Sequence, residues 1–211
     1  NYPTHEIGPI AKLLDINCGN RFLSLVSVGS KSAGLARYAK DQKIDHLMDV
    51  KFAQSDVVTT IIKCQNGETV TIALDTSLPR FYARGFVAQG TKGLISEDLS
   101  CVYLDDEHKD GHRFWNEMEN NLDHYYARYE HPLWVGYRPG KEGHNGIDAL
   151  EFDALFRALD EGKPMPIDVY DMATWMSISV LSEQSMATGQ AVPFPDFTDG
   201  KWIQRENTFA L

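Results

Sequence analysis

A phenol and an imidazole stand close together at the start of the chain, in the sequence Asn-Tyr-Pro-Thr-His-Glu-Ile-Gly-Pro. Tyr2 and His5 flank Pro3, whose restricted φ stiffens the turn, and a helical pattern follows at once. The unperturbed pKa of imidazole lies nearest neutrality, so such a corner suits proton transfer to or from a bound hydroxyl. Because an active-site corner stands at the first residues, we expect the chain to be the C-terminal part of a larger protein.

The hydrophobic pattern after this corner changes from helical to strand periodicity. Residues 5–16 place apolar side chains on one helical face. The strongest β signal is a hairpin in which Asn66-Gly67 separates two β-branched runs, because both residues tolerate positive φ. Short turns between successive strands imply an antiparallel, meandering sheet. Strands are predicted over residues 21–28, 57–64, 69–75, 82–89, 93–95 and 101–104.

The second half of the chain is mainly helical. A loop rich in Pro, Gly and aromatic residues spans 131–145, and residues 192–211 are expected to form an extended C-terminal arm. Strands followed by helices predict an α+β fold, with an open, mostly antiparallel β-sheet and helices packed on one face. Helices are predicted over residues 112–128, 147–160 and 168–184, the last with Asp168 as its N-cap, and a weak helix or ordered loop over 32–43.

The composition is that of an ordinary globular unit. With 211 residues, of which 43% are hydrophobic and 24% charged, the chain can bury a sizeable core. The net charge of -10 disfavours nucleic acid or an anionic membrane surface as a partner, and no apolar run is long enough to span a bilayer. The three cysteines, Cys18, Cys64 and Cys101, lack CxxC spacing, which disfavours a disulfide framework or a zinc site. Cys64 and Cys101 are predicted to be buried free thiols.

Several common catalytic motifs are missing from the sequence. There is no GxGxxG after a strand, no P-loop, no GxSxG elbow and no HExxH. His108 and His112 have a helix-like spacing beside Asp105, Asp106 and Glu107 and could mimic a metal site. A solvated acidic loop explains these residues better, and no metal is predicted. The chain alone therefore lacks a phosphate cradle, a metal cage and a clear nucleophile.

Four sequence blocks occur in an order that points to a known family. They are Tyr2-Pro3-Thr4-His5 before a helix with Gly-Pro, Asp75-Thr76-Ser77-Leu78-Pro79-Arg80-Phe81-Tyr82-Ala83-Arg84, Gln89-Gly90-Thr91-Lys92-Gly93, and Gly143-His144-Asn145-Gly146. In these blocks the chain resembles glycoside hydrolase family 109, the NAD-dependent α-N-acetylgalactosaminidases of the Gfo/Idh/MocA oxidoreductase superfamily. It departs from the usual pattern at Phe81, where the family commonly has Pro, and at Asn145, where it has Gly. Both differences bear on substrate preference rather than on reaction type.

The resemblance implies a domain organisation. In this superfamily an N-terminal Rossmann domain binds the dinucleotide, and a C-terminal α+β domain supplies the substrate pocket and the oligomer interface. Residues 1–211 would then be the C-terminal substrate-binding and oligomerisation domain, with the Rossmann domain absent. A homo-oligomer through the β-sheet would follow. The family also suggests a bacterial protein, with export to the periplasm as one location it allows.

The resemblance also implies a reaction. NAD-dependent glycosidases are an exception to the usual pair of catalytic carboxylates. The cofactor oxidises the 3-hydroxyl of the sugar, and the resulting ketone acidifies the proton on carbon 2. Elimination then expels the anomeric substituent, water adds, and the hydride returns. The cofactor carries the hard step, while the protein positions a terminal N-acetylgalactosamine and moves protons.

The site residues are carried over from the family motifs. His5 is expected to be the acid–base catalyst, and substrate contacts are expected from Tyr2, Pro3, Thr4, His5, Tyr82 and His144. Tyr2 and His5 would also meet the nicotinamide end of NAD, which the N-terminal domain would mainly bind. Each residue has a structural alternative: an aromatic ring at a strand start commonly packs, and the glycines beside His144 can simply shape a turn. Trp134 and Tyr137 could form an aromatic wall for a sugar or anchor their loop.

Three functions remain open from the sequence. The first is the substrate-binding domain of a retaining α-N-acetylgalactosaminidase, in which these 211 residues alone fold but neither bind NAD tightly nor cleave a glycoside. The second is a sugar or polyol NAD(P)-dependent dehydrogenase, which would accumulate NADH with its product. The third is a non-catalytic binding or assembly module, which tight NAD binding by the full-length protein would exclude.

Overall fold

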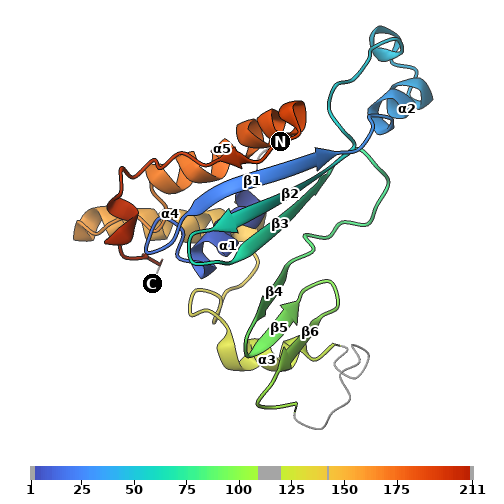
Figure 1. Cartoon of the computed structure of the whole chain (residues 1–211). Coiled ribbons are helices and arrows are strands. Elements are labelled where there is room, and N and C mark those ends of the chain that lie inside the picture. Colours follow the sequence, from blue (N-terminus) through green and yellow to red (C-terminus); the bar gives the residue numbers. More distant parts are fainter. Residues whose placement is uncertain (1–2, 109–119, 142, 210–211) are drawn as a thin grey trace. The chain divides into compact units, whose positions relative to one another are not determined.

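The computed structural model describes residues 3–108, 120–141 and 143–209, and the chain divides into two units (Figure 1). Unit 1 comprises Asn1–Arg80 and Ile167–Thr208, and unit 2 comprises Phe81–Pro166 and Phe209–Leu211. The chain therefore leaves unit 1 after residue 80 and returns to it at residue 167.

Unit 1 is built on a four-stranded antiparallel sheet with the strand order β3-β2-β1-β7. Its central strands are β1 (Phe22–Gly29) and β2 (Val57–Cys64). One edge strand is β3 (Thr69–Asp75), and the other is the short β7 (Val192–Pro193). The β2–β3 hairpin has the bounds that the sequence predicts. Gly67 in its turn has a φ of 104°, a backbone conformation that glycine adopts without a steric cost.

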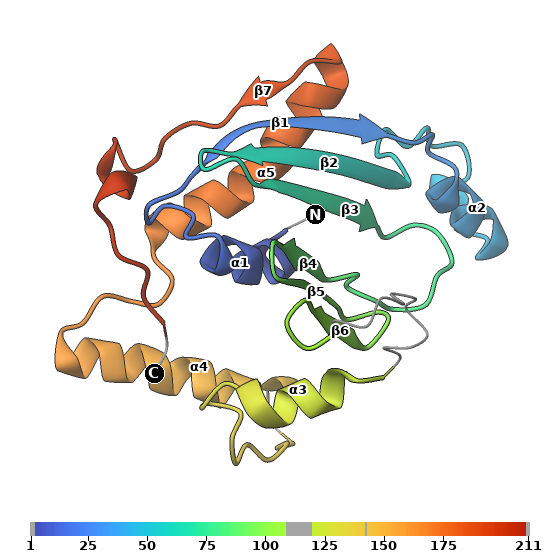
Figure 2. The same cartoon turned by 60° about the horizontal axis from the view of Figure 1, so that its bottom comes forward.

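Helices cover one face of this sheet. Along β2 the even-numbered residues from 58 to 64 are buried and the odd-numbered residues from 59 to 63 are exposed. The buried side packs against α1 (Thr4–Leu13) and α5 (Val169–Thr188), and α5 crosses behind β1 and β2 in Figure 2. The predicted α+β fold with an open antiparallel sheet and helices is confirmed. The core consists of Ile7, Ala11, Ile16, Phe22, Leu25, Ile62, Cys64, Val70, Trp175, Ile178 and Phe194.

The ends of α5 follow from its sequence. The side chain of Asp168 accepts hydrogen bonds from the backbone N–H groups of Tyr170 and Asp171 at 2.9 and 3.1 Å, and the Asp171 side chain completes a capping box. The helix continues past the predicted end at residue 184 to Thr188, because Gly189 is the first residue to adopt a left-handed conformation, with a φ of 68°. Among the described residues, no helix is long and apolar enough to cross a membrane.

Unit 1 also contains several shorter elements. The helix α2 (Gly34–Asp41) falls within the predicted weak helix, and a single 3₁₀ turn follows it at Asp45–Leu47. In the segment expected to form a C-terminal arm, Val192–Pro193 pair with β1, and the next residue, Phe194, is buried against Phe22. A second 3₁₀ turn lies at Lys201–Ile203.

The described residues of unit 2 form a three-stranded antiparallel sheet and two helices. The sheet has the order β4-β5-β6, with β4 (Val87–Gly90), β5 (Gly93–Ser96) and β6 (Cys101–Leu104). The helices are α3 (Leu122–Tyr129) and α4 (Gly143–Glu161). A small core of Val102, Leu122 and Tyr125 joins α3 to β6.

The structure corrects two predictions in this region. The strand expected over residues 82–89 begins only at Val87, because Gly85 adopts a φ of 66° that a strand cannot continue through, and the partner β5 is only four residues long. The strands also divide between two sheets instead of meandering in one. Of the helix expected over 112–128, the structure shows α3 from Leu122, and residues 109–119 lie outside the described residues.

The cysteines behave as free thiols. Cys64 and Cys101 are buried, as the sequence predicts, and Cys18 is half-buried. Burial, followed by the nearby charge of Glu68, raises the pKa of Cys64 to about 11, so this thiol stays protonated near neutral pH.

Candidate functional site

The predicted N-terminal corner forms the start of α1 in unit 1. Pro3 is the residue before the helix, with a φ of -88°, and its carbonyl accepts a hydrogen bond from the Ile7 N–H at 2.9 Å. Pro3 and Thr4 are half-buried, and His5 is exposed. Tyr2, which is expected to contact the substrate, lies outside the described residues.

The inner face of α1 explains why His5 is exposed. Ile7 is fully buried, and a Cβ added to Gly8 would lie 3.4 Å from the ring of Trp175 on α5. Residues two apart on a helix lie about 200° apart around its axis, so packing of Ile7 against the core turns His5 to the other side. The contact of α1 with α5 therefore determines which way the imidazole faces.

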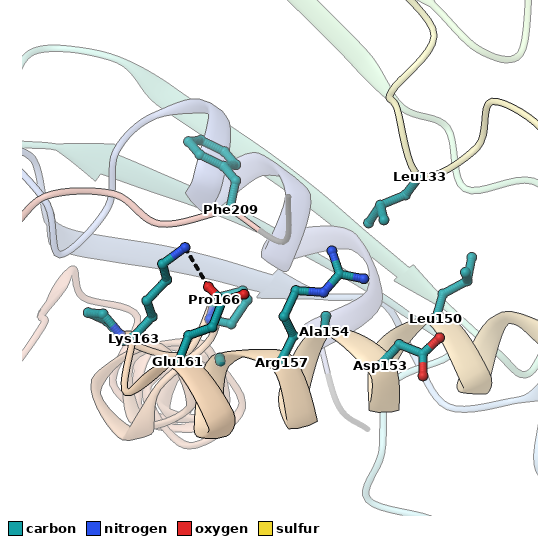
Figure 3. A pocket seen from close by; sticks show the side chains of 11 residues that line it. Leu133, Leu150, Asp153, Ala154, Arg157, Glu161, Lys163, Pro166 and Phe209 are labelled. Atoms are coloured by element: carbon teal, nitrogen blue, oxygen red, sulfur yellow. Dashed lines mark ion pairs between the residues drawn. The ribbon is translucent and has the colours of Figure 1, made fainter.

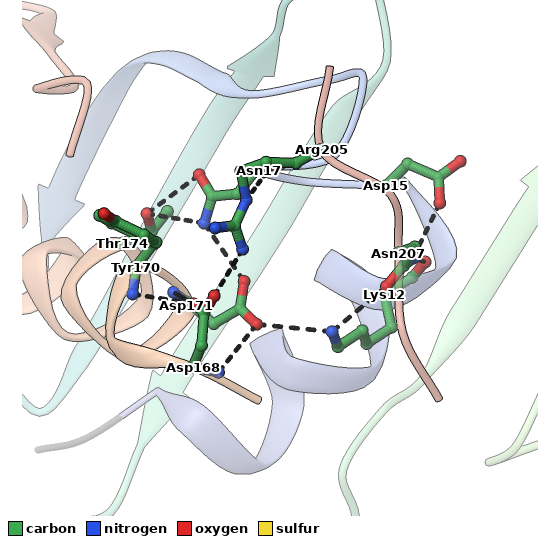
Figure 4. Close-up of polar contacts among 9 residues, drawn as sticks. All are labelled: Lys12, Asp15, Asn17, Asp168, Tyr170, Asp171, Thr174, Arg205 and Asn207. Atoms are coloured by element: carbon green, nitrogen blue, oxygen red, sulfur yellow. Dashed lines mark hydrogen bonds and ion pairs between the residues drawn. The ribbon is translucent and has the colours of Figure 1, made fainter. Parts of the chain in front are cut away.

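A buried polar network fixes the other end of α1 (Figure 4). Lys12 Nζ lies 3.4 Å from Asp171 Oδ2, and the Asp171 side chain is only 5% exposed. Asn17 Nδ2 donates to Asp171 Oδ1 at 3.3 Å and to Thr174 Oγ1 at 3.1 Å. Because removal of one partner leaves another buried polar group unpaired, this network holds α1 and the loop after it in one position on α5.

The C-terminal segment closes over the same network. Arg205 donates to the Asn17 carbonyl at 3.0 Å and to Asp168 Oδ2 at 2.6 Å, and its guanidinium lies over the ring of Tyr170 (Figure 4). Asn207 donates to the Lys12 carbonyl at 2.9 Å and to Asp15 Oδ1 at 2.8 Å. The segment thus ties the start of α5 to the end of α1.

Opposing influences act on the pKa of Asp168. Burial raises the pKa of this carboxyl, but hydrogen bonds from Arg205 and from the backbone N–H groups of Asp171 and Tyr170 outweigh it and hold the pKa below its ordinary value. The carboxylate therefore remains charged and keeps its bond to Arg205 under ordinary conditions.

Tyr82 lies in unit 2, in the irregular segment before β4. It is 88% exposed, and the neighbouring Phe81 is 78% exposed. Since the strand begins five residues later, at Val87, the ring of Tyr82 is not packed on a sheet as an ordinary strand aromatic would be. A large aromatic side chain presented in this way suits contact with a sugar ring.

His144 lies in a left-handed turn at the start of α4. Gly143, His144, Asn145 and Gly146 all have positive φ, and the regular helix starts at Ile147, as predicted. The Asn145 carbonyl accepts hydrogen bonds from the Tyr137 hydroxyl at 2.6 Å and from the Gly140 N–H at 2.5 Å.

The imidazole of His144 is 80% exposed and is paired with an acid that the sequence analysis did not identify. Its Nδ1 lies 2.7 Å from Asp148 Oδ1. In the sequence, Asp148 is marked only as an acid four residues after the histidine of a glycine-flanked motif, and this spacing alone does not predict the contact.

Two aromatic residues of the preceding loop contact each other and bind this turn. The rings of Trp134 and Tyr137 meet edge to face, with centroids 5.1 Å apart. Because the Tyr137 hydroxyl also binds the Asn145 carbonyl, these residues anchor their loop to the turn that carries His144. The loop-anchor alternative is therefore observed in the structure.

Unit 2 contains a cavity (Figure 3). It has a volume of about 90 Å³ and lies along α4, between Leu133 and Phe209. An ion pair between Lys163 and Glu161, 2.6 Å apart, borders it. Ligand pockets usually hold about 300–1,000 Å³, so this cavity is too small for a sugar residue, and none of the predicted site residues lines it.

The possible metal pair does not form in the described residues. The His108 ring lies against Tyr103, and its Nδ1 is 2.9 Å from the Leu104 carbonyl oxygen. His112 lies outside the described residues. Glu107 is bound by the Tyr125 hydroxyl and by Arg128, which lower the pKa of its carboxyl.

Two segments of the described chain can be examined as phosphate-binding sites. Gly90-Thr91-Lys92-Gly93 is the hairpin turn between β4 and β5. The described helix that directly follows a strand is α2, and its first N–H groups are already taken: Ala33 and Gly34 donate to the carboxylate of Asp56 at 2.8 and 2.9 Å. A pyrophosphate would need these groups unpaired. The N-terminus of α2 is therefore already occupied by Asp56.

The predicted site residues thus occur in both units. Pro3, Thr4 and His5 belong to unit 1, and Tyr82 and His144 belong to unit 2. His5, Tyr82 and His144 are exposed, whereas Pro3 and Thr4 are half-buried.

Comparison with known proteins gives the chain a family. The model of the family described as "Glycosyl hydrolase 109, C-terminal domain" matches residues 1–204. Over 215 aligned residues, the chain is 44% identical to a glycosyl hydrolase family 109 protein of Parabacteroides distasonis and 44% identical to an alpha-N-acetylgalactosaminidase of Tannerella forsythia. Each alignment covers 100% of this chain and 45% of the relative, so the chain spans less than half the length of these proteins.

A solved structure shows the same fold. The crystal structure of an oxidoreductase domain protein from Kribbella flavida matches with a TM-score of 0.51 and 18% identity, covering 84% of this chain and 45% of that one. At this identity the likeness concerns the fold alone. The match of residues 1–204 and the 44% identity of two relatives are decisive for the family: the chain belongs to glycosyl hydrolase family 109 and corresponds to its C-terminal domain.

Proposed function

We propose that this chain is the substrate-binding domain of a two-domain, retaining α-N-acetylgalactosaminidase that hydrolyses terminal α-linked N-acetylgalactosamine. The observation that carries the proposal is the 44% identity, over the whole chain, to a protein named alpha-N-acetylgalactosaminidase. NAD, bound mainly by an N-terminal domain, would supply the oxidation of the sugar and its later reduction. Between these steps the anomeric substituent leaves by elimination and water adds.

In this proposal the residues of the chain bind the sugar and move protons. His5 is exposed on the first turn of a helix whose other face is packed, so its ring can accept and donate a proton at a substrate hydroxyl. Tyr2, Pro3 and Thr4 line the sugar beside it, and Tyr2 and His5 meet the nicotinamide end of NAD. Tyr82 and His144 contribute further contacts to the substrate.

The test is replacement of His5 by Ala in the full-length protein. His5→Ala should lower turnover of an aryl α-N-acetylgalactosaminide by about 100-fold to 10,000-fold, the usual contribution of a general acid or base. The melting temperature and the amount of bound NAD should not change. His46→Ala is the matched control, because His46 is also an exposed histidine in a helical turn of unit 1.

The outcomes separate the proposal from its alternatives. Turnover of His5→Ala within a few-fold of wild type would end the catalytic role of His5. Formation of NADH in step with product by the wild-type protein would indicate a sugar or polyol dehydrogenase. Absence of both turnover and NAD binding in the wild type would indicate a non-catalytic binding or assembly module.

We further propose an assembly and a location. The face of the four-stranded sheet opposite α5 exposes Val26, Val28 and Ile61, and an apolar sheet face of this kind suits contact with a second copy of the chain.

The relatives named above are bacterial, and export to the periplasm is the location we propose. Fractionation of the source cells would test the location.

A further inference from the structure

The turn that carries His144 is held in a conformation that its residue types do not favour. The φ angles of residues 143 to 146 are 20°, 43°, 63° and 93°. Two of these four residues, His144 and Asn145, are not glycine and adopt the left-handed region only where their surroundings hold them there. The bonds of the Asn145 carbonyl to Tyr137 and Gly140 are part of that support.

The same turn brings Asp148 against His144. In a regular helix two residues four apart share one face, but here the three residues 144 to 146 are left-handed. The pair meets because the turn folds back over the first turn of the regular helix. A Cβ added to Gly143 would overlap the carboxylate of Asp148, so glycine at this position leaves room for the acid.

The contact decides which imidazole nitrogen carries the proton. A carboxylate can only accept hydrogen bonds, so at 2.7 Å from Asp148 Oδ1 the Nδ1 of a neutral His144 is the protonated nitrogen. Nε2 then keeps its lone pair. Because the side chain is 80% exposed, that lone pair can accept a hydrogen bond from a ligand hydroxyl.

We infer that Asp148 is the positioning residue of His144. The left-handed turn presents the imidazole, and Asp148 holds it in the Nδ1–H tautomer, so that Nε2 accepts a hydrogen bond from a sugar hydroxyl. The identity of the ligand rests on the proposed function, whereas the tautomer rests on the turn and on the contact with Asp148.

The experiment compares Asp148→Ala and Asp148→Asn in the full-length protein. The tautomer of His144 is measured by ¹⁵N NMR, with its signal assigned through His144→Gln. kcat and KM on an aryl α-N-acetylgalactosaminide and the melting temperature are measured on the same variants. Asp41→Ala is the matched control, because Arg37 and Asp41 form an exposed pair with the same spacing of four residues, 3.3 Å apart.

The expected result is a specific loss in Asp148→Ala. The Nδ1–H tautomer should no longer dominate, and KM should rise by about 10-fold to 100-fold, the scale seen when the hydrogen-bond partner of a metal-binding histidine is removed. kcat and the melting temperature should change little, because the contact is on the surface. Asp148→Asn should keep most of the wild-type behaviour, since its amide oxygen still accepts the Nδ1–H bond.

Three results would overturn the inference. They are an unchanged His144 tautomer in Asp148→Ala, a KM within a few-fold of wild type, and an equal loss in the Ala and Asn variants. A wild-type protein without glycosidase activity would instead refute the proposed function. In that case the tautomer measurement, made without substrate, still decides whether Asp148 controls the imidazole.

Discussion

At the scale of single residues, the sequence located the histidines but not the groups that hold them. His5 and His144 are chosen from short motifs, and their functional roles stay predictions. Asp148 could not be deduced in the same way, because its contact with His144 depends on three left-handed residues that spacing alone does not reveal. The partners of Arg205 lie 37 and 188 residues away in the chain, and no local pattern could pair them.

Asp168 allows a prediction at this scale, because one carboxylate both caps α5 and binds Arg205. Asp168→Ala should lower the free energy of unfolding at neutral pH by at least the cost of losing a helix cap, about 0.5–2 kcal/mol. Asp160→Ala, an exposed acid on α4, is the control and should change it by less than about 0.5 kcal/mol. Denaturant unfolding of the two variants and the wild type measures the difference.

The effect of Asp168 should also depend on pH. Folding lowers the pKa of this carboxyl, so its charged form stabilises the protein above the ordinary pKa, and that stability is lost as the pH falls through the lower, folded value. The difference between wild type and Asp168→Ala should therefore shrink below about pH 4, where the carboxyl of the unfolded chain is protonated. A difference that grows on acidification would contradict this assignment.

At the scale of elements, prediction succeeded where the signal was local. The β2–β3 hairpin was predicted with its correct bounds because Asn66-Gly67 specifies the turn and the flanking residues alternate. The strand predicted from residue 82 begins later because alternation of polar and apolar residues does not reveal the length of the partner strand. The partner β5 has only four residues, and the positive φ of Gly85 interrupts the extended backbone. The short β7 was missed because Val192 and Pro193 pair with Leu25 and Ser24, which lie far away in the sequence, and no local pattern identifies such a partner.

Two glycines with open surroundings test the role of backbone conformation in these elements. A Cβ added to Gly67 or to Gly90 would meet nothing within 4 Å, but only Gly67 has a positive φ, of 104°. Gly67→Ala should destabilise the protein by about 1 kcal/mol or more, whereas Gly90→Ala should be neutral or stabilise it by up to about 1 kcal/mol. Thermal unfolding of both variants measures the two effects. Equal destabilisation by both substitutions would show that loss of the left-handed conformation is not the cause.

At the scale of the whole molecule, composition and element order were enough for the fold class but not for the division of the chain. The α+β architecture with an antiparallel sheet follows from the succession of strands and helices. The division into two units follows from a long excursion, residues 81–166, between two parts of unit 1. After residue 166 the chain returns to unit 1, where α5 and β7 contact β1. No local sequence pattern predicts contacts between segments so far apart in the chain.

The exposed face of the four-stranded sheet carries the last prediction. Val26 and Ile61 are paired across β1 and β2 and are 38% and 47% exposed, on the face opposite the buried side of the sheet. If a second copy of the chain covers this face, Ile61→Lys would bury a charge without a partner, which is strongly unfavourable. The full-length wild-type protein should therefore sediment as a dimer or larger oligomer, and Ile61→Lys should shift it toward monomer.

Val180→Lys is the matched control for this prediction. Like Ile61, Val180 is an exposed β-branched apolar residue of unit 1, but it lies on α5 rather than on the sheet and is 67% exposed. The same charge placed there should leave the oligomer intact, because that surface is not the proposed interface. Both variants should keep the wild-type melting temperature when compared as monomers, since both side chains are exposed in the isolated unit. A wild-type protein that sediments as a monomer at high concentration, or an oligomer that Val180→Lys and Ile61→Lys disrupt equally, would rule out assembly through this face.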